Sequence, residues 1–564
     1  MSKIKNNIQK YKTLLVVATL LLVGTGIYAN ALGNAMFWDD QDSILNNSFI
    51  KDWSYFPKYF TENLIAGANL ISNYWRPILL TVFALEWHLW GEAVQGYHAV
   101  NVLFHIGNAL LAYFLLKKLF KKDLTAFIAS FIFLIHPLQT EAVTYVSGLA
   151  DPLSAFFILA GLIFYLKFKD SNKNFWASWP YVLSLFFFAL ALMTKEPAVV
   201  MPGLVLLVEA FSNSQTWKNK IAPLKNLIID AIKNVSPFVM VAAIYLILRA
   251  TILNFDNTFN VYGEANEITA NLWYRLYVFF NAFVEYVRLL FVPTALHMER
   301  DSGFLAGLSQ LKSGLGAAGV AALLTLAFSQ FKKRPALSFG IFWFFLRLLP
   351  NANLVVPNSG LIYEHWLYLP MLGAWLSVAW FATEQIPAFF ANHRKRTKMA
   401  AILVSLLFFV FLGVQTVKRN AEWQNPIRFY EQTLFFAPQS YRVINNLGMA
   451  YAEAKNYNQA ESNYEKAIAL DPNNPTAYHN LANVYRDTGR FELAEEYYKI
   501  AIGHDPNFVF SYHALLKLYL NLAEYYYRSD DTQKSIDHLK KAQELAPNEP
   551  IIARTIQYLE KNKE

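Results

Sequence analysis

The sequence contains no cysteine. This absence excludes disulfide bonds, thiol catalysis and metal sites with cysteine ligands. Charged side chains are also scarce, at 16% of residues, whereas hydrophobic residues make up 55% and aromatic residues 16%. The mean hydropathy of +0.24 is too high for an ordinary soluble protein. The composition of this 564-residue chain therefore predicts a protein that crosses a membrane several times.

The net charge of +8 is unevenly distributed. From Gln439 onward there are 14 Lys and Arg against 17 Asp and Glu, whereas the preceding 438 residues have 35 against 24. A basic excess confined to an apolar region is expected from Lys and Arg in cytoplasmic loops. The charge therefore gives no reason to expect a nucleic-acid partner.

Apolar runs long enough to form membrane spans begin close to the N-terminus. The first run, Thr13 to Ala31, could be a signal peptide, because small residues around Asn30 resemble a cleavage site. We interpret it as an uncleaved span, because its length of about 17 residues is close to what a span needs. Ten further runs bring the predicted number to about eleven: 97–116, 123–137, 150–167, 178–194, 198–212, 236–253, 313–331, 336–350, 366–383 and 400–417.

Five basic clusters test this count. With a cytoplasmic N-terminus and eleven spans, all five fall on the cytoplasmic side, as the positive-inside rule requires, and the C-terminus falls outside. Leu272 to Val292 is also apolar, but Glu285 and Arg288 interrupt it, so we predict a re-entrant or interfacial segment there. The basic clusters are 117–122, 167–173, 218–225, 332–334 and 393–396.

The C-terminal part repeats itself every 34 residues. Leu447, Tyr451 and Pro472 recur as Leu481, Tyr485 and Pro506. This period, with small residues at fixed places, is that of tetratricopeptide helix pairs. The spacing slips by seven residues near 525–528, and the pattern extends backward as a half repeat over 420–438.

The predicted fold class is therefore all-α, with two parts. A polytopic membrane helix bundle occupies residues 1–418 and includes a long, aromatic-rich first outer loop at 33–96. An α-solenoid of tetratricopeptide repeats occupies 419–564 on the outer side, with complete repeats from about 439. We expect amphipathic helices on the membrane within the outer loop. The solenoid groove is expected to hold an extended acceptor protein or peptide.

Polar residues cluster on the predicted outer side. Asp39 and Asp40 begin the outer loop, and neighbouring carboxylates can have separated pKa values, which leaves one as a base at neutral pH. A solvated helix flank is the alternative. Arg76 in the same loop suits bidentate binding of a phosphate, or it snorkels to lipid headgroups.

Further candidates flank later spans. The spacing of His136 and Glu141, with a proline between them, argues against a metal pair. Asp151 is either a site residue or an acid that stabilises a helix N-terminus through the helix dipole. The neighbours Lys195 and Glu196 could form an ion pair with each other. Together these residues fit a site for a charged substrate attached to a lipid. The remaining candidates are Arg288, Glu364 and His365.

Several short motifs occur in a fixed order: Trp38-Asp39-Asp40, Tyr74-Trp75-Arg76-Pro77, the stretch 96–105, the stretch 136–143, Lys195-Glu196 and Tyr368-Leu369-Pro370. With the terminal repeats, this order resembles the transmembrane and tetratricopeptide-repeat O-mannosyltransferases, a family of GT-C glycosyltransferases. The resemblance covers essentially the whole chain. Two departures stand out: Leu149 and His365 occupy places where the family usually or often has arginine.

The resemblance implies transfer of a sugar, mannose in the best-known members, from a polyprenyl-phosphate carrier to a hydroxyl, expected on protein Ser or Thr. The reaction would take place at the outer face and invert the configuration at the anomeric carbon of the sugar, with Asp39 or Asp40 as the base. No cofactor is expected beyond the lipid-linked donor, and a divalent metal is not expected to be required. The alternatives are a ligase or polymerase of lipid-linked glycans and a non-enzymatic, membrane-anchored scaffold.

Overall fold

The computed structural model describes residues 2–171, 178–212, 224–255, 271–358, 360–389 and 395–562. All regular elements within these ranges are helices, and none is a strand. The all-α prediction is therefore confirmed. The chain forms two compact units, Met1–Asn425 and Pro426–Glu564.

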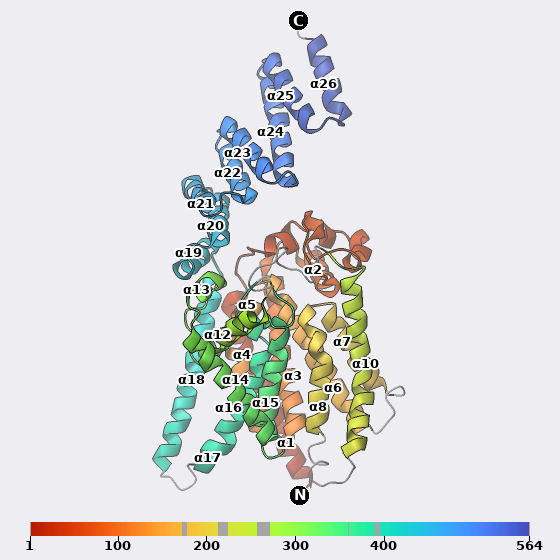
Figure 1. Ribbon diagram of the computed structural model, residues 1–564, viewed down its shortest axis with the longest axis vertical. Coiled ribbons are helices and arrows are strands. Elements are labelled where there is room, and N and C mark those ends of the chain that lie inside the picture. Colours follow the sequence, from red (N-terminus) through yellow and green to blue (C-terminus); the bar gives the residue numbers. More distant parts are fainter. Residues whose placement is uncertain are drawn as a thin grey trace. The chain divides into compact units, whose positions relative to one another are not determined.

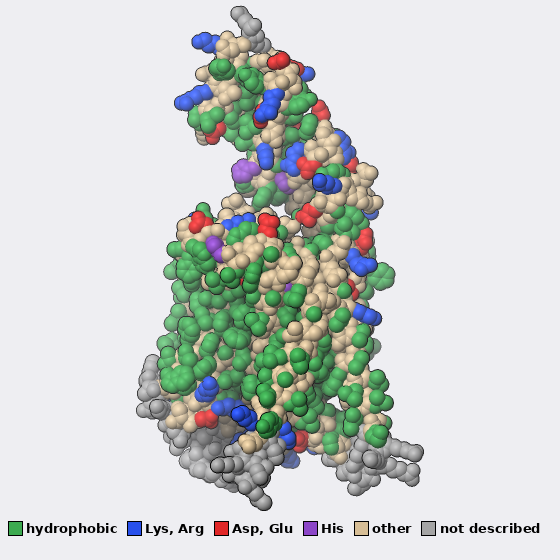
Figure 2. Space-filling model, turned by 180° about the vertical axis from the view of Figure 1, so that it is seen from behind, with side chains coloured by type: hydrophobic (Ala, Val, Ile, Leu, Met, Phe, Trp, Pro, Cys, Tyr) green, Lys and Arg blue, Asp and Glu red, His purple; other side chains and the backbone are tan. Residues whose placement is uncertain are grey.

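The first unit consists mainly of long apolar helices that run side by side (Figure 1). Hydrophobic side chains cover much of the flank of this bundle in Figure 2. Six of its helices are long and apolar enough to cross a membrane. They are α1 (Ser2–Tyr28), α3 (Val94–Phe120), α6 (Ala150–Asp170), α10 (Leu224–Ala250), α14 (Gln310–Gln330) and α18 (Lys395–Glu422). A seventh candidate combines α4 (Asp123–Ile135) with the following segment Pro137–Val143, which is bent from it by 55°.

The predicted count of eleven spans is not confirmed. Four predicted spans form helices of only 11 to 14 residues: α7 (Trp179–Leu192), α8 (Met201–Ser212), α15 (Pro335–Leu348) and α16 (Pro370–Trp380). A span needs about 20 residues. All four helices have a proline in their first two positions, where its fixed φ and missing N–H favour a helix start. A hydropathy pattern does not show where a proline starts a helix within an apolar run, so it overestimates the length of these helices. Lys173, Lys218, Lys220, His393 and Arg394 of the basic clusters lie outside the described residues.

The ambiguous segment 272–292 forms one helix, α12 (Leu272–Phe291). The Asn271 side chain caps its N-terminus by accepting hydrogen bonds from the backbone nitrogens of Trp273 and Tyr274. This helix packs against α14 and is not among the candidate spans of the described chain.

The first outer loop has a hydrophobic core of its own. It contains a π-helical turn at Gln41–Leu45, three 3₁₀ turns at Ser48–Lys51, Trp53–Phe60 and Ala66–Ala68, and the helix α2 (Pro77–Trp90). The sequence predicts amphipathic helices on the membrane in this loop. The structure has short turns there instead, and they pack against α2. The core residues contributed by the loop include Ile44, Phe49, Ile50, Tyr59, Leu79, Leu80 and Phe83. This packing gives Asp39 and Asp40 a folded support.

The second unit is a series of helix pairs, as the 34-residue period predicts. The predicted solenoid is confirmed. Its seven-residue insert lengthens one first helix from 13 to 20 residues. The unit begins with α19 (Pro426–Phe436), inside the predicted half repeat. The helix pairs are α20 (Tyr441–Glu453) with α21 (Tyr457–Leu470), α22 (Pro475–Asp487) with α23 (Phe491–His504), and α24 (Val509–Arg528) with α25 (Thr532–Leu545), followed by α26 (Pro550–Lys561).

Candidate functional site

The turn region 136–149, between α4 and α6, holds much of the candidate site together. It contains two 3₁₀ turns, Pro137–Gln139 and Ser147–Leu149, and the short helix α5 (Thr140–Val143). Residues 136 to 146 are all buried. Pro137 cannot donate the hydrogen bond that would continue α4, so the chain turns there. Side chains from this region contact the first outer loop, the segment before α16 and the end of α18.

Asp40 is buried and fixed to this turn region. Its Oδ1 accepts hydrogen bonds from the backbone nitrogen of Ser147 at 2.7 Å and from the Ser147 hydroxyl at 2.6 Å. Its Oδ2 accepts a third from the backbone nitrogen of Phe37 at 3.3 Å. Burial raises the pKa of Asp40 to about 7, against these hydrogen bonds, which favour the charged form. Asp40 therefore holds the first outer loop in place.

Asp39, in contrast, is exposed. Its backbone nitrogen donates a hydrogen bond of 2.9 Å to the hydroxyl of Tyr145. The preceding residue, Trp38, has a φ of 61°, a left-handed conformation that is unusual for a bulky side chain. Such backbone conformations concentrate at functional sites, where the surroundings hold them. The loop thus leaves residue Asp39 exposed, while the neighbouring Asp40 is buried and its carboxylate is fixed by Ser147.

The C-terminal end of α18 and the residue that follows it, Trp423, complete this arrangement. Tyr145 stacks on Trp423, with ring centroids 5.3 Å apart, and Phe37 packs on the same indole at 5.5 Å. Asn420 accepts a hydrogen bond of 2.7 Å from the Thr144 hydroxyl. The polypeptide around Asp39 is therefore held jointly by the turn region and by the last apolar helix.

Two ion pairs connect the other predicted residues. Arg76 binds Glu196, with 2.8 Å between Nη2 and Oε2, while Lys195 Nζ lies 2.7 Å from Asp151 Oδ2. Lys195 and Glu196 do not pair with each other because Lys195 has an extended backbone, with φ −157° and ψ 133°. Neighbouring side chains in extended chain point to opposite faces. Each residue therefore reaches a different partner.

The electrostatics of these two pairs differ. Burial opposes ionisation of Glu196, but the Arg76 guanidinium outweighs it and holds the pKa of Glu196 below its usual range. Burial also lowers the pKa of Lys195, despite the attraction of Asp151. Asp151, Lys195 and His365 line one small pocket together with Arg347, whose Nη1 donates to the carbonyl of Pro197 at 2.9 Å. The pocket thus brings together candidates from three separate motifs.

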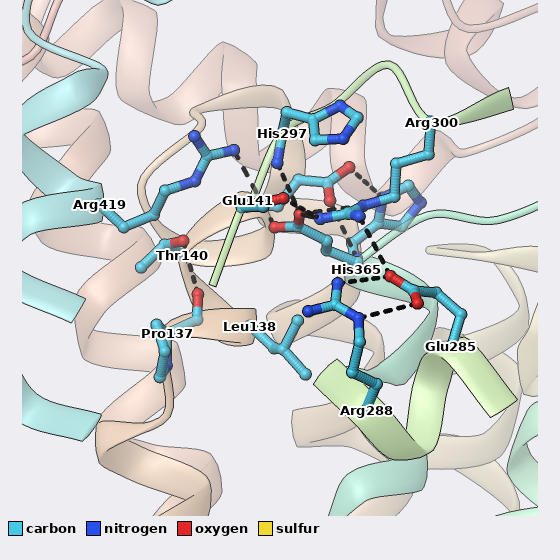
Figure 3. A network of polar contacts seen from close by, with 12 residues as sticks. Pro137, Leu138, Thr140, Glu141, Glu285, Arg288, His297, Arg300, His365 and Arg419 are labelled. Carbon is cyan, nitrogen blue, oxygen red and sulfur yellow. Dashed lines mark hydrogen bonds and ion pairs between the residues drawn. The ribbon is translucent and has the colours of Figure 1, made fainter. Parts of the chain in front are cut away.

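Glu141 and His365 lie in a second polar network (Figure 3), to which Glu364 belongs through its ion pair with Arg300. His365 Nδ1 is 2.7 Å from Glu141 Oε1, and the His365 backbone nitrogen donates to Glu141 Oε2 at 3.2 Å. Glu364 is completely buried. It forms an ion pair with Arg300, accepts a hydrogen bond from the His297 backbone nitrogen at 2.8 Å, and lies 4.0 Å from Arg419 Nη2.

Arg288 belongs to the edge of the same network. Its guanidinium binds Glu285 on the same helix, with 2.8 Å between Nε and Oε2. Glu285 also lies 3.7 Å from Arg300 Nη1, which links Arg288 indirectly to Glu364. Arg300 and Arg419 were missed from the sequence. Arg419 could have been noticed as a cation next to Asn420 at the end of an apolar run. A basic residue in that position is usually interpreted as the end of a membrane span.

His136 has a structural place. Its Nδ1 accepts a hydrogen bond from the backbone nitrogen of Leu138 at 3.2 Å, and its Nε2 lies 3.0 Å from the carbonyl oxygen of Leu290. Both ring nitrogens of this buried imidazole are therefore engaged within the fold. In the described part of the chain, no group of three or more His, Asp or Glu side chains is placed to hold a metal ion.

Comparisons with known proteins agree with the motifs. Residues 54–282 match the family described as dolichyl-phosphate-mannose-protein mannosyltransferase, and residues 448–489 and 473–548 match tetratricopeptide repeats. The protein O-mannosyl-transferase F38B6.6 of Caenorhabditis elegans is 25% identical over 82% of this chain and 63% of its own. The human protein O-mannosyl-transferase TMTC3 is 24% identical over 78% of this chain and 50% of its own. The chain resembles the TMTC protein O-mannosyl-transferases. The similarity to TMTC3 and its relatives spans only about half to two thirds of those proteins' length.

Two solved structures also align with this chain, at lower sequence identity than the TMTC proteins. ArnT of Cupriavidus metallidurans, bound to undecaprenyl phosphate, aligns over 91% of this chain and 80% of its own, with 13% identity and a TM-score of 0.39. The oligosaccharyltransferase AglB of Archaeoglobus fulgidus aligns over 77% and 60%, with 13% identity and a TM-score of 0.41. These scores are too low to support an argument about the site.

Proposed function

We propose that this protein is an inverting membrane glycosyltransferase that moves a sugar, with mannose the first candidate, from a polyprenyl-phosphate carrier to a hydroxyl of a protein acceptor. The observation that carries the proposal is the division of labour between two adjacent carboxylates. Asp40 is buried and fixed by Ser147, whereas Asp39 is exposed beside it on backbone held by Tyr145. The similarity to the TMTC proteins supports the choice of reaction.

In the proposed reaction, Asp39 is the general base and Asp40 is a positioning residue. Asp39 takes the proton from the acceptor hydroxyl as that oxygen attacks the anomeric carbon of the sugar. The bond between this carbon and the phosphate oxygen breaks on the opposite face, and its electron pair leaves with the polyprenyl phosphate. One displacement inverts the anomeric centre and needs no covalent enzyme intermediate.

The departing phosphate develops negative charge, which nearby cations would stabilise. Arg76 and Lys195 are the best-placed of the predicted residues, because both are largely buried and lie on neighbouring ion pairs. Each is already paired with a carboxylate, so donor binding would exchange part of that pairing for the phosphate. Arg288 is more exposed and held by Glu285, which makes it a weaker candidate.

The test uses purified full-length protein with a panel of polyprenyl-phosphate sugars and a Ser/Thr peptide, and measures release of polyprenyl phosphate together with glycosylated peptide. Loss of a general base costs about 10²–10⁴-fold in turnover, so Asp39→Asn should lose about that much. Asp40→Asn should also lose activity but keep the acidic limb of the pH–rate profile. Asp42→Asn, in the same loop, is the matched control and should remain active. Chelators should have no effect.

Near-normal turnover in Asp39→Asn would exclude it as the base. If no polyprenyl-phosphate sugar is turned over by the wild-type protein, the enzyme proposal itself is wrong and the scaffold alternative gains support.

A further inference from the structure

An apolar groove runs along the outside of the first unit, between α1, α4 and α18. Its volume is about 550 Å³, within the range of ligand sites. Ile27 comes from α1, Phe131 and Ile135 come from α4, and the α18 wall extends from Leu406 to Lys418. Every lining residue except Gly413 and Lys418 has a hydrophobic side chain. We name this feature the α18 groove.

The groove belongs to the part of the fold that faces lipid. The windows of α1 and α18 that qualify as membrane spans are only 22% and 11% buried within the protein. An apolar hollow between two such helices excludes water and suits a hydrocarbon chain. Lys418, at the end of α18 that leads to the candidate site, is exposed and pairs with no carboxylate in the described part of the chain. Its position suits an anionic headgroup on that hydrocarbon chain.

The outer end of the groove is joined directly to the candidate site. Asn30 donates a hydrogen bond of 2.9 Å to the carbonyl oxygen of Val417, and Asn420 donates one of 3.0 Å to the carbonyl oxygen of Ile27. Five residues beyond Lys418, Trp423 stacks on Tyr145, whose hydroxyl holds the backbone of Asp39. All three groove helices continue into segments that carry candidate site residues.

We propose that the α18 groove binds the isoprenoid chain of the lipid-linked sugar donor, with Lys418 attracting its phosphate at the end of the groove as the donor enters and Arg76 and Lys195 acting on that phosphate only during transfer. This inference rests on the proposed function and adds a location for the lipid. A bulk phospholipid would gain nothing from a groove that is linked to Asp39 through Trp423 and Tyr145. The sugar of the donor must reach the Asp39 carboxylate. Binding of the isoprenoid chain in the groove would align the sugar with that carboxylate, because binding a remote part of a substrate positions its reacting centre.

Gly413 offers a way to fill the groove. A Cβ added there would meet only Ile27 Cδ1, at 3.5 Å, which is ordinary van der Waals contact. Gly413→Leu therefore adds bulk to the groove with little strain on its walls. The matched control is Leu407→Trp, a larger change on the same helix at a side chain that is 59% exposed and does not line the groove.

The first experiment measures binding without turnover. Full-length protein in nanodiscs is labelled with a photoreactive polyprenyl phosphate, and the labelled residues are mapped. Label should fall on α18 between residues 406 and 418, and unlabelled polyprenyl phosphate should compete where phosphatidylglycerol does not. Gly413→Leu should reduce this labelling about tenfold, equivalent to about 1.4 kcal/mol, and Leu407→Trp should not. Lys418→Gln should reduce it about fivefold, as expected for one basic side chain facing an anionic lipid, while Lys418→Arg should restore it.

The second experiment uses the transfer reaction. Gly413→Leu should raise KM about tenfold for a full-length donor and leave a donor of two isoprene units unchanged. Equal competition by phosphatidylglycerol would make the groove a bulk-lipid site, and cross-links between two copies would make it a subunit interface. Either result, or unchanged labelling in Gly413→Leu, would overturn the proposal. If labelling behaves as expected but no sugar is transferred, the groove proposal stands and the proposed function fails.

Discussion

Ser147 donates two hydrogen bonds to one carboxylate oxygen of Asp40, at 2.7 Å from its backbone nitrogen and at 2.6 Å from its hydroxyl. The two residues are 107 positions apart, and their contact ties the first outer loop to the start of α6. Two residues earlier, Tyr145 holds the backbone of Asp39. A single turn region therefore fixes the carboxylate of the buried Asp40 and the backbone of the exposed Asp39.

The first prediction concerns the pH dependence of stability. Burial raises the pKa of Asp40 to about 7, above its unfolded value near 4. The folded state therefore prefers the protonated acid, so this contribution is full below about pH 4 and is lost as the pH rises through 7. Asp40→Asn should lack this trend. From pH 5 to pH 8 the free energy of unfolding of wild type should fall relative to the variant by up to about 3 kcal/mol, because the window begins above the unfolded pKa. Thermal unfolding in detergent should show this as a Tm difference that shrinks or reverses.

Asp52→Asn serves as the control for that measurement, because its exposed carboxylate has a pKa below its usual value and stays ionised across this range. Parallel Tm curves for wild type and Asp40→Asn between pH 5 and pH 8 would contradict the prediction.

The second prediction concerns the buried pair Glu364–Arg300. Removing one partner of a buried pair leaves an uncompensated charge and costs about 3–5 kcal/mol. Arg300→Met should therefore destabilise the protein strongly. Adding Glu364→Gln to it should cost much less than the sum of the single changes, because the orphaned charge is gone. Thermal unfolding of the four proteins in the cycle measures this coupling.

The exposed pair Arg528–Glu524 gives a matched comparison, with side chains 76% and 60% exposed. Its coupling should stay below about 1 kcal/mol. Equal coupling in the two cycles would show that burial does not determine the strength of the Glu364–Arg300 pair.

The two halves of the fold differ in how far the sequence predicts them. The tetratricopeptide unit is predictable because its contacts are local and repeat every 34 residues, so that even the insert could be placed before it appeared as a longer α24. The apolar unit follows hydropathy only in part. Prolines such as Pro335 and Pro370 set helix starts within apolar runs and shorten the helices below the span length.

For the site, the sequence indicates candidate residues but not their partners. Asp39 and Asp40 stand out because two adjacent acids follow an apolar run. Ser147 carries no such signal, since a serine in a turn is common and only the tertiary fold brings it to Asp40. Arg300 lies in a segment without a recognisable motif and becomes evident only through Glu364. Long-range charge pairing of this kind is set by packing and not by sequence spacing.

The third prediction concerns orientation in the membrane. If the N-terminus is cytoplasmic and the repeats are outside, a reporter that is active only in the cytoplasm should be silent when fused after Glu564. The reason is the positive-inside rule, applied to the five basic clusters. The same reporter inserted between Lys121 and Lys122 should be active. An active reporter at Glu564 would place the repeats on the cytoplasmic side and would contradict the predicted outer location of the proposed site.

The last prediction separates the roles of the two units. We expect the repeats to raise the local concentration of a bound acceptor, which lowers KM for that acceptor without changing the barrier for a small one. A chain ending at Asn425, the boundary between the units, should therefore still release polyprenyl phosphate from the donor and glycosylate a short peptide. Its KM for a folded or extended protein acceptor should rise by about 10²-fold, within the range expected when a second binding module is lost.

The truncation must first match the full chain in thermal stability, since α19 begins directly after the cut. A second variant keeps the whole chain and changes the exposed Tyr525 and Tyr527 of α24 to Ser, which tests the repeat surface without removing it. This variant should raise KM for the protein acceptor and leave the peptide reaction unchanged. Equal loss of peptide and protein transfer in a stable truncation would mean that the repeats support the catalytic unit structurally, and the acceptor-binding role would be wrong.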